Sequence, residues 1–225
     1  MDVLERLRGG LIASCQPVDD GAMDRPDIVA AMAQAAVAGG ADGLRIEGVE
    51  NLRAVRPVVG VPIIGIVKSD LADSPVRITV RLEEARALAE AGADVIAYDA
   101  TPRPRPAPRE AVLAEILRLG RVAMADCATI EDARAALAGG AAIIGTTLSG
   151  YTAETEGLND GPDFGLITAF RALGGGFVMA EGRINTPELA ARARQAGADA
   201  VTVGSALTRL EHVTGWFAAA IRNAR

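Results

Sequence analysis

The stretch AGADVIAYD, at Ala91–Asp99, decides the fold because variants of it occur at three other places in the chain. They are AGGADGLRI at Ala38–Ile46, AGGAAIIGT at Ala138–Thr146 and AGADAVTVG at Ala196–Gly204. In each copy an alanine-rich helix ends, a glycine permits a left-handed C-cap, and a run that favours a strand begins. The copies lie roughly fifty residues apart, which is room for two strand–helix units. Four repeats therefore predict eight such units.

Short apolar runs supply the expected strands. They lie at Leu11–Gln16, Gly43–Glu47, Pro62–Lys68, Val95–Ala100, Val122–Cys127, Ile143–Thr147, Phe177–Gly182 and Ala200–Ser205. Amphipathic segments that favour helices include Ile28–Ala38, Leu82–Ala91, Ile130–Ala138, Pro187–Ala196 and Val213–Ala224. Strands that are apolar on both faces and alternate with helices predict a parallel sheet covered on all sides.

Two α/β architectures fit this alternation, an open doubly wound sheet and a closed (β/α)8 barrel. The open sheet requires a glycine-rich phosphate turn after its first strand. The first strand instead ends in Ser14-Cys15-Gln16-Pro17, which contains no such turn. We therefore expect a single (β/α)8 TIM barrel domain over residues 1–225.

Composition narrows the function classes. The net charge of −6 argues against a nucleic-acid partner but leaves room for a phosphate pocket. The chain has two cysteines and one histidine, His212, which favours a reducing compartment and excludes a two-histidine metal site. The acidic N-terminus is unlike a signal peptide, and no uncharged apolar run is long enough for a membrane span. We expect a cytoplasmic protein without a metal or a membrane partner.

Polar residues end nearly every expected strand, where barrel enzymes build their active sites. They are Gln16, Arg45 with Glu47, Lys68, Asp99, Asp126, Thr146 with Thr147, Glu181 and Ser205. Any one of them can simply meet solvent or cap the next helix, but their recurrence around the rim favours a functional site. Lys68 and Glu181 follow strands that are four apart in a ring of eight. They should therefore face each other across the barrel mouth, as a two-base proton transfer requires.

Loops at two places carry the features of a phosphate site. Gly182 and Arg183 follow the seventh expected strand, and Gly204, Ser205 and Arg209 follow the eighth. Barrels often bind phosphate there through backbone N–H groups. The alternative is that Ser205 merely caps a helix.

Four other features leave alternatives open. The proline-rich loop 101–109 is either a solvated connection or brings Arg103 and Arg105 near an anion. The loop Leu148–Asp163 is a candidate lid. Cys15 and Cys127 are expected to be small buried thiols. Trp216 and Phe217 predict packing of the last helix against the barrel or against a second subunit, so a homodimer is one possible assembly.

The chain resembles the N-acetylmannosamine-6-phosphate 2-epimerase family of bacterial sialic acid and amino-sugar catabolism along almost its whole length. The matching blocks are GGLIASCQ, RIEGVENLRAVR, VPIIGIVKSD, DSPVRIT, GADVIAYDAT, MADCAT, GTTLSGYT, AEGRINTPE and VGSALTR. The resemblance implies a (β/α)8 barrel that interconverts N-acetyl-D-mannosamine 6-phosphate and N-acetyl-D-glucosamine 6-phosphate without a cofactor. The chain departs from the family pattern at Ser69, where arginine is frequent, and in its proline content after Thr101.

The resemblance also implies roles for individual residues. It places the catalytic lysine at Lys68 and its acidic partner at Glu181. The implied substrate-binding residues are Gln16, Arg45, Asp126 and Thr147. The implied phosphate-binding residues are Gly182, Arg183, Gly204, Ser205 and Arg209. Abstraction of the C2 proton of the open-chain sugar would give an enolate, with either Lys68 or Glu181 as the base. Two other functions stay open, a Schiff-base aldolase or lyase acting through Lys68, and a non-catalytic sugar-phosphate-binding barrel.

Overall fold

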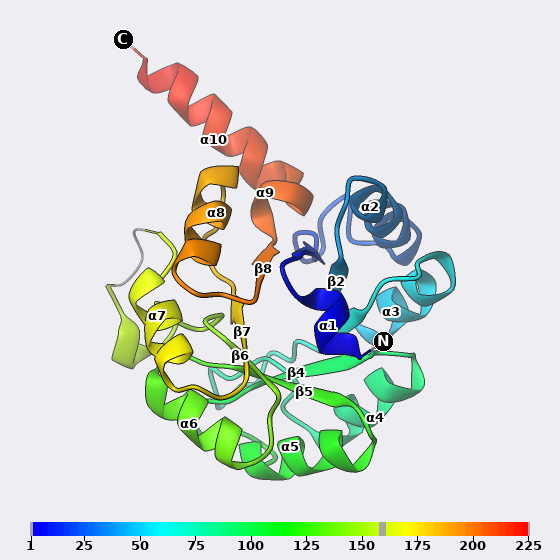
Figure 1. Ribbon diagram of the computed structural model, residues 1–225. Helices are drawn as coiled ribbons and strands as arrows, with labels where there is room; N and C mark the ends of the chain where they lie inside the picture. Colours follow the sequence, from blue (N-terminus) through cyan, green and yellow to red (C-terminus); the bar gives the residue numbers. More distant parts are fainter. Residues whose placement is uncertain (1, 158–160, 225) are drawn as a thin grey trace.

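A computed structural model describes residues 2–157 and 161–224. Eight parallel strands close into a barrel in sequence order, which confirms the expected fold (Figure 1). The strands are β1 (Leu11–Cys15), β2 (Gly43–Glu47), β3 (Ile63–Ile66), β4 (Val95–Asp99), β5 (Val122–Asp126), β6 (Ile143–Gly145), β7 (Phe177–Ala180) and β8 (Ala200–Val203). The ring closes where β1 pairs with β8, from Leu11 opposite Val201 to Ala13 opposite Val203.

Helices surround the ring. They are α1 (Val3–Leu7), α2 (Pro26–Ala38), α3 (Val49–Val55), α4 (Leu82–Glu90), α5 (Arg109–Arg118), α6 (Ile130–Ala138), α7 (Phe164–Ala172), α8 (Pro187–Gln195), α9 (Ser205–Thr208) and α10 (Leu210–Asn223). Short 3-10 turns occupy η1 (Arg56–Val58) and η2 (Ala153–Thr155). All eight expected strands and the five named helices are present. Seven of the eight strands end one or two residues before their expected limits, and β2 ends at Glu47 as expected.

The repeated Gly-Ala-Asp phrase has a structural reason. The carboxylate of Asp94 accepts a hydrogen bond from the backbone N–H of Ile63 at 2.9 Å, which ties the start of β4 to the start of β3. Asp42 does the same for Leu11 at 3.0 Å, and Asp199 for Val178 at 2.8 Å. Three of the four repeats thus supply a carboxylate acceptor at the point where a new strand joins the ring, and the third copy along the chain has Ala142 at this position instead.

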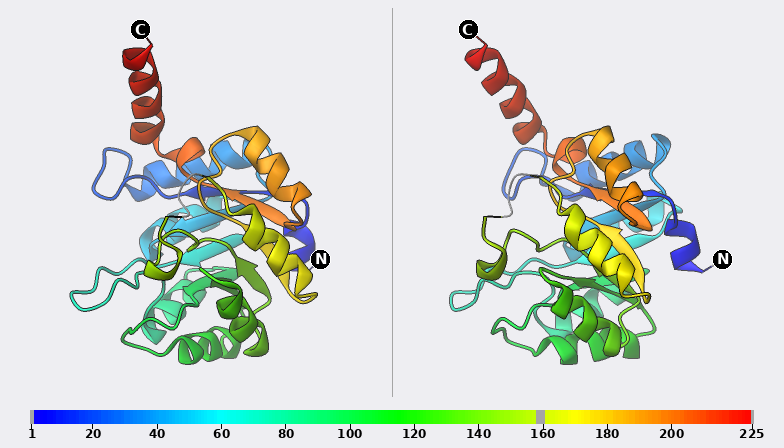
Figure 2. Two further views of the ribbon diagram at one scale, coloured as in Figure 1. Left: turned by 90° about the vertical axis from the view of Figure 1, so that its left-hand side faces the viewer. Right: turned by 60° about the vertical axis from the view of Figure 1, so that its left-hand side comes forward.

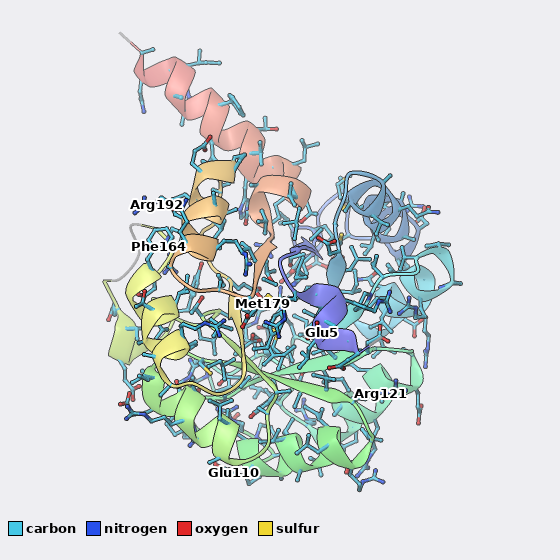
Figure 3. All side chains as sticks on the ribbon, viewed as in Figure 1. Glu5, Glu110, Arg121, Phe164, Met179 and Arg192 are labelled. Atoms are coloured by element: carbon cyan, nitrogen blue, oxygen red, sulfur yellow. The ribbon has the colours of Figure 1, made fainter. Side chains whose placement is uncertain are left out.

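Side-chain alternation divides the strands into two layers. Inward-facing Ile12, Ile64, Val95, Met124, Ile143, Phe177, Met179 and Ala200 pack with Leu7 of α1 inside the barrel. Figure 3 shows Met179 at the centre of the ring. The alternate residues pack outward against the helices, among them Cys15 and Cys127, which are buried free thiols as expected. Because strand side chains alternate with a period of two, Lys68, Asp126, Thr147 and Glu181 continue the inward layer at the mouth of the barrel.

Helix α10 leaves the barrel and projects from it in all three views (Figures 1 and 2). None of its described residues is buried, and Trp216 and Phe217 are 42% and 68% exposed. The sequence left two alternatives for this helix. The first, packing against its own barrel, is therefore wrong. Over the described residues, no helix is both long and apolar enough to cross a membrane.

Candidate active site

A cavity of about 490 Å³ opens at the carboxyl ends of the strands. Residues from six strand-end loops line it. They are Ser14, Gln16, Lys68, Pro75, Arg77, Ile78, Asp99, Arg103, Thr147, Leu148, Tyr151, Glu181, Gly182, Arg183, Ile184, Asn185, Thr202, Gly204, Ser205 and Arg209. Five of these side chains are cationic and two are acidic, in a chain whose net charge is −6. The cavity is thus locally suited to an anionic ligand.

Lys68 follows β3 and is the only lysine in the chain. Its backbone is held from the β2 side, where its N–H donates to Oε1 of Glu47 at 3.2 Å. On the other side Lys68 forms an antiparallel bridge with Ile78. Burial lowers the pKa of the Lys68 amine, and the positive charge of Arg209 lowers it further. The carboxylates of Asp19 and Glu47 act in the opposite direction and raise it.

Glu181 follows β7 and sits above a buried charge network. Arg45 donates from Nη1 to Oε2 of Glu181 at 3.0 Å, and from Nη2 to Oδ2 of Asp126 at 2.6 Å. Thr147 Oγ1 donates to Oδ1 of Asp126 at 2.6 Å. The hydroxyl of Thr146 both donates to the backbone carbonyl of Glu181 and accepts from its N–H, at 2.9 and 3.1 Å. Glu181 is therefore fixed through its backbone and its carboxylate.

The network has one cation for two carboxylates. Burial raises the pKa of Glu181 to about 7; the positive charge of Arg45 opposes the rise, and the negative charge of Asp126 adds to it. Burial disfavours the charged form of Arg45, but the carboxylates of Asp126 and Glu181 outweigh this and raise its pKa. Arg45 thus stays charged, whereas Glu181 exchanges its proton near neutral pH.

The expected phosphate loops lie together on one side of the cavity. Gly182 has φ 112, which favours glycine, and the next residue, Arg183, is also left-handed with φ 55. Arg183 donates to the backbone carbonyls of Ser149 and Gly161 at 2.9 and 2.8 Å. Its guanidinium also lies over the ring of Tyr151, 5.1 Å from the centroid. Arg183 thus links this loop to the Leu148–Asp163 loop, part of which (158–160) lies outside the described residues.

The proline-rich loop after β4 brings its arginines to a carboxylate of the same chain. Asp99 is buried and accepts from Arg103 Nη2 at 2.7 Å and from Arg105 Nη2 at 3.1 Å. The Arg105 side chain is 3% exposed, so this part of the loop is not simply solvated. Arg103 lines the cavity as well. Both arginines thus pair with Asp99 of the same chain, and their approach to a bound anion stays a prediction.

The structure brings most of the expected site residues to one cavity. The exceptions are Arg45 and Asp126, which are 1% and 0% exposed and lie beneath Glu181, and Glu47 and Thr146, which do not line the cavity either. Sequence reasoning missed Ser14 and Thr202, whose hydroxyls line the cavity. They lie two residues before Gln16 and Gly204, so the period of the strands could have identified them. Thr202 Oγ1 is buried, and the Thr202 side chain opposes the rise in the pKa of Glu181.

Comparisons with known proteins identify the family of this chain. The NanE family model, "Putative N-acetylmannosamine-6-phosphate epimerase", matches residues 29–223. Two relatives are named "Putative N-acetylmannosamine-6-phosphate 2-epimerase", one from Haemophilus influenzae and one from Proteus mirabilis. The first is 57% identical and the alignment covers 100% of this chain and 97% of the relative. The second is 60% identical, with 96% of this chain and 91% of the relative covered.

A solved structure extends the match to three dimensions. The N-acetylmannosamine-6-phosphate 2-epimerase from Clostridium perfringens superposes with a TM-score of 0.94 at 36% identity. The superposition covers 98% of this chain and 96% of that one. The resemblance found in the sequence is thereby confirmed, and the chain belongs to the NanE family of N-acetylmannosamine-6-phosphate epimerases.

Proposed function

We propose that this protein interconverts N-acetyl-D-mannosamine 6-phosphate and N-acetyl-D-glucosamine 6-phosphate by moving the proton at C2, as a step in bacterial sialic acid and amino-sugar catabolism. One observation carries the proposal. Lys68 and Glu181 line the same cavity, and their pKa values move toward neutrality from opposite sides. A lowered amine pKa and a raised carboxyl pKa both favour groups that take up and release protons during a reaction. Family membership supports the substrate assignment.

The chemistry requires the open-chain sugar, because the C2 proton is acidic only beside the C1 aldehyde. Lys68 or Glu181 removes this proton, an enolate forms, and a proton returns to the opposite face. Arg45 lies 3.0 Å from Glu181 and stabilises its ionised form, so it favours the state in which Glu181 has lost its proton. Gln16 and Thr147 are proposed to contact the sugar hydroxyls from two sides of the cavity.

The phosphate is proposed to bind between the loops after β7 and β8, at Gly182–Arg183 and Gly204–Ser205. Arg209 reinforces this end of the cavity, and its Nε donates to the backbone carbonyl of Gln16 at 3.1 Å. Its remaining guanidinium nitrogens suit a phosphate oxygen. With the phosphate placed here, the opposite end of the open-chain sugar lies toward Lys68 and Glu181.

Epimerisation in D₂O, followed by NMR without added metal or nucleotide, tests this function. We expect N-acetylmannosamine 6-phosphate to give N-acetylglucosamine 6-phosphate carrying deuterium at C2, because a proton held on Lys68 or Glu181 exchanges with solvent. A requirement for NAD would refute the mechanism, since the sugar would then be oxidised and reduced again. Product that carries no deuterium would indicate that a single group moves the proton and keeps it from exchanging with solvent. Borohydride trapping of the substrate on Lys68 would favour the aldolase or lyase, and binding without turnover would favour a silent binder.

We also propose a homodimer that covers α10. Along this helix Leu210, Phe217 and Ile221 are 61%, 68% and 74% exposed. An apolar hollow of about 560 Å³, lined among others by Leu11, Val201 and Leu207, lies over β8 and β1. In a symmetric dimer, the apolar face of α10 from each copy can occupy the apolar hollow of the other copy, so that both surfaces are covered. Sedimentation should show a dimer for the full chain and a monomer for Phe217→Glu; a monomeric full chain would contradict the proposal.

A cytoplasmic location is proposed on the state of the cysteines. Cys15 and Cys127 are both free and buried, and burial raises the pKa of Cys15 to about 12. Free thiols of this kind are usual in reducing compartments. Fractionation of cells that produce the protein would test the location.

A further inference from the structure

Glu47 is a strand-end carboxylate that the proposed reaction does not use. It lies two residues after Arg45 on β2, so it belongs to the same inward-facing layer, one step nearer the mouth. It is absent from the described residues that line the cavity. Its carboxylate contacts the backbone of Lys68 instead, so this contact has to be explained by something other than binding the sugar.

The backbone N–H of Lys68 lies just beyond the regular pairing of β2 with β3. The two strands pair in register as far as Glu47 opposite Ile66. At Gly48, with φ 86, the chain turns out of the sheet, and α3 begins at Val49. The backbone of β2 thus offers no further strand residue beside Lys68. Oε1 of Glu47 takes the place of the missing acceptor and receives the Lys68 N–H at 3.2 Å.

Glu47 is itself anchored. Its backbone carbonyl accepts a hydrogen bond from Nδ2 of Asn51 in α3 at 2.8 Å. The far side of the Lys68 segment is held by the return strand of its own loop, where Thr79 N–H donates to the Val67 carbonyl at 2.8 Å and Ser69 N–H to the Arg77 carbonyl at 2.9 Å. The β2 side of Lys68 itself depends on the Glu47 carboxylate.

The opposite wall of the cavity uses the same device. Glu181 follows β7 as Lys68 follows β3, and the side chain of Thr146, from the preceding strand-end, makes hydrogen bonds with its backbone. In both cases a side chain of the preceding strand replaces the strand pairing that has ended. Both groups assigned to proton transfer thus receive this support at their backbones.

We propose that Glu47 is a positioning residue for Lys68, whose carboxylate fixes the backbone beyond β3 and thereby the point at which the amine enters the cavity. The effect on turnover rests on the proposed function; the effect on the lysine itself does not. Removing the side chain releases the Lys68 N–H, while Glu47→Gln keeps an acceptor oxygen and removes the negative charge.

The charge of Glu47 gives a second, independent signature. The charged groups that act on Lys68 are Asp19 from the loop after β1, Arg209 from the loop after β8, Arg45 and Glu47 from β2, and Glu181 from β7. Burial raises the pKa of Glu47 itself, and the N–H and charge of Lys68 oppose the rise. The carboxylate of Glu47 stabilises the ammonium form of Lys68. Its removal therefore lowers the pKa of the amine.

The kinetic test compares Glu47→Ala, Glu47→Gln and the control Glu50→Gln, which removes a charge from the exposed face of α3. We expect kcat to fall about ten- to a hundredfold in Glu47→Ala, as for a misplaced catalytic group, with KM for N-acetylmannosamine 6-phosphate changed less than about threefold. Glu47→Gln should recover most of kcat, and its rate profile should move to lower pH. Wild-type kcat in Glu47→Ala would overturn the proposal.

The NMR test uses the fact that the chain has one lysine. Protein labelled with ε-¹³C lysine gives a single side-chain resonance, which titrates with the Lys68 amine. We expect the titration of Glu47→Gln to move to lower pH and that of Glu50→Gln to match the wild type. An unchanged titration in Glu47→Gln would overturn the charge contact. Because this measurement needs no turnover, it separates failure of the Glu47 proposal from failure of the proposed epimerase function.

Discussion

Replacement of Glu181 by Gln should lower kcat at least about a hundredfold and at the same time stabilise the fold at alkaline pH. The carboxylate is held at 14% side-chain exposure, beside Arg45, a cation that Asp126 already neutralises. Ionised Glu181 therefore leaves one excess negative charge inside the network. Burial raises its pKa from the ordinary 4.5 to about 7, and each pKa unit corresponds to about 1.4 kcal/mol. The ionised form thus costs the fold about 3 kcal/mol.

The pH dependence of the stability follows from how many protons the native and unfolded states bind. Between pH 4.5 and 7 the native state holds the Glu181 proton that the unfolded state has released, so stability falls as pH rises through this interval. Glutamine retains an oxygen that accepts from Arg45 and carries no charge. We expect Glu181→Gln to raise the thermal midpoint by roughly 6–12 °C at pH 8, and by little below pH 4.5, for a domain of this size.

Calorimetry of both proteins at pH 4.5, 6 and 8 measures this difference, with Glu188→Gln on the exposed start of α8 as the control. The variant should also lose at least about a hundredfold in kcat. A variant that melts at or below the wild-type temperature at pH 8 would refute the argument, because the Glu181 carboxylate would then stabilise the fold.

Three further predictions follow from the same network and cavity. Lys68→Ala should lower kcat at least about a hundredfold while calorimetric substrate binding persists; near-normal turnover would exclude its role. Arg45→Leu leaves Asp126 buried without its cation, so urea unfolding should show a loss of about 3–5 kcal/mol, and an unchanged midpoint would contradict that pairing. Arg209→Ala should raise KM roughly tenfold or more with a smaller change in kcat, since a charged phosphate contact is lost; an unchanged KM would place the phosphate elsewhere.

The limits of sequence reasoning show most clearly at the C-terminal helix. Its amphipathic pattern predicted a helix over Val213–Ala224, and the structure has it at Leu210–Asn223. Its apolar side chains gave no means of choosing between the barrel and another subunit, because a hydrophobic face requires a partner without specifying one. The structure shows that α10 projects away from its own barrel, which leaves the face uncovered.

For the buried polar residues, too, the sequence predicted one part and the tertiary structure supplied the rest. Arg45, Asp126 and Glu181 were recognisable as strand-end residues, yet the sequence offered no sign that the first two lie beneath the third. The three come from β2, β5 and the end of β7, and Arg45 is separated from its partners by 81 and 136 residues. Likewise, the Pro-rich loop 101–109 contains three arginines, but only its path in the folded chain shows that Arg103 and Arg105 reach Asp99.

What the sequence by itself determined is the set of local patterns: the Gly-Ala-Asp repeat, the eight strands, and, through their period of two, which strand-end side chains face inward. These follow from neighbours in the chain, since turn chemistry and side-chain alternation act over a few residues. Tertiary structure alone decided which inward groups pair, which stay free for substrate, and which pKa values move. Those outcomes depend on closure of the ring, which places distant strands within hydrogen-bond reach and removes their side chains from water.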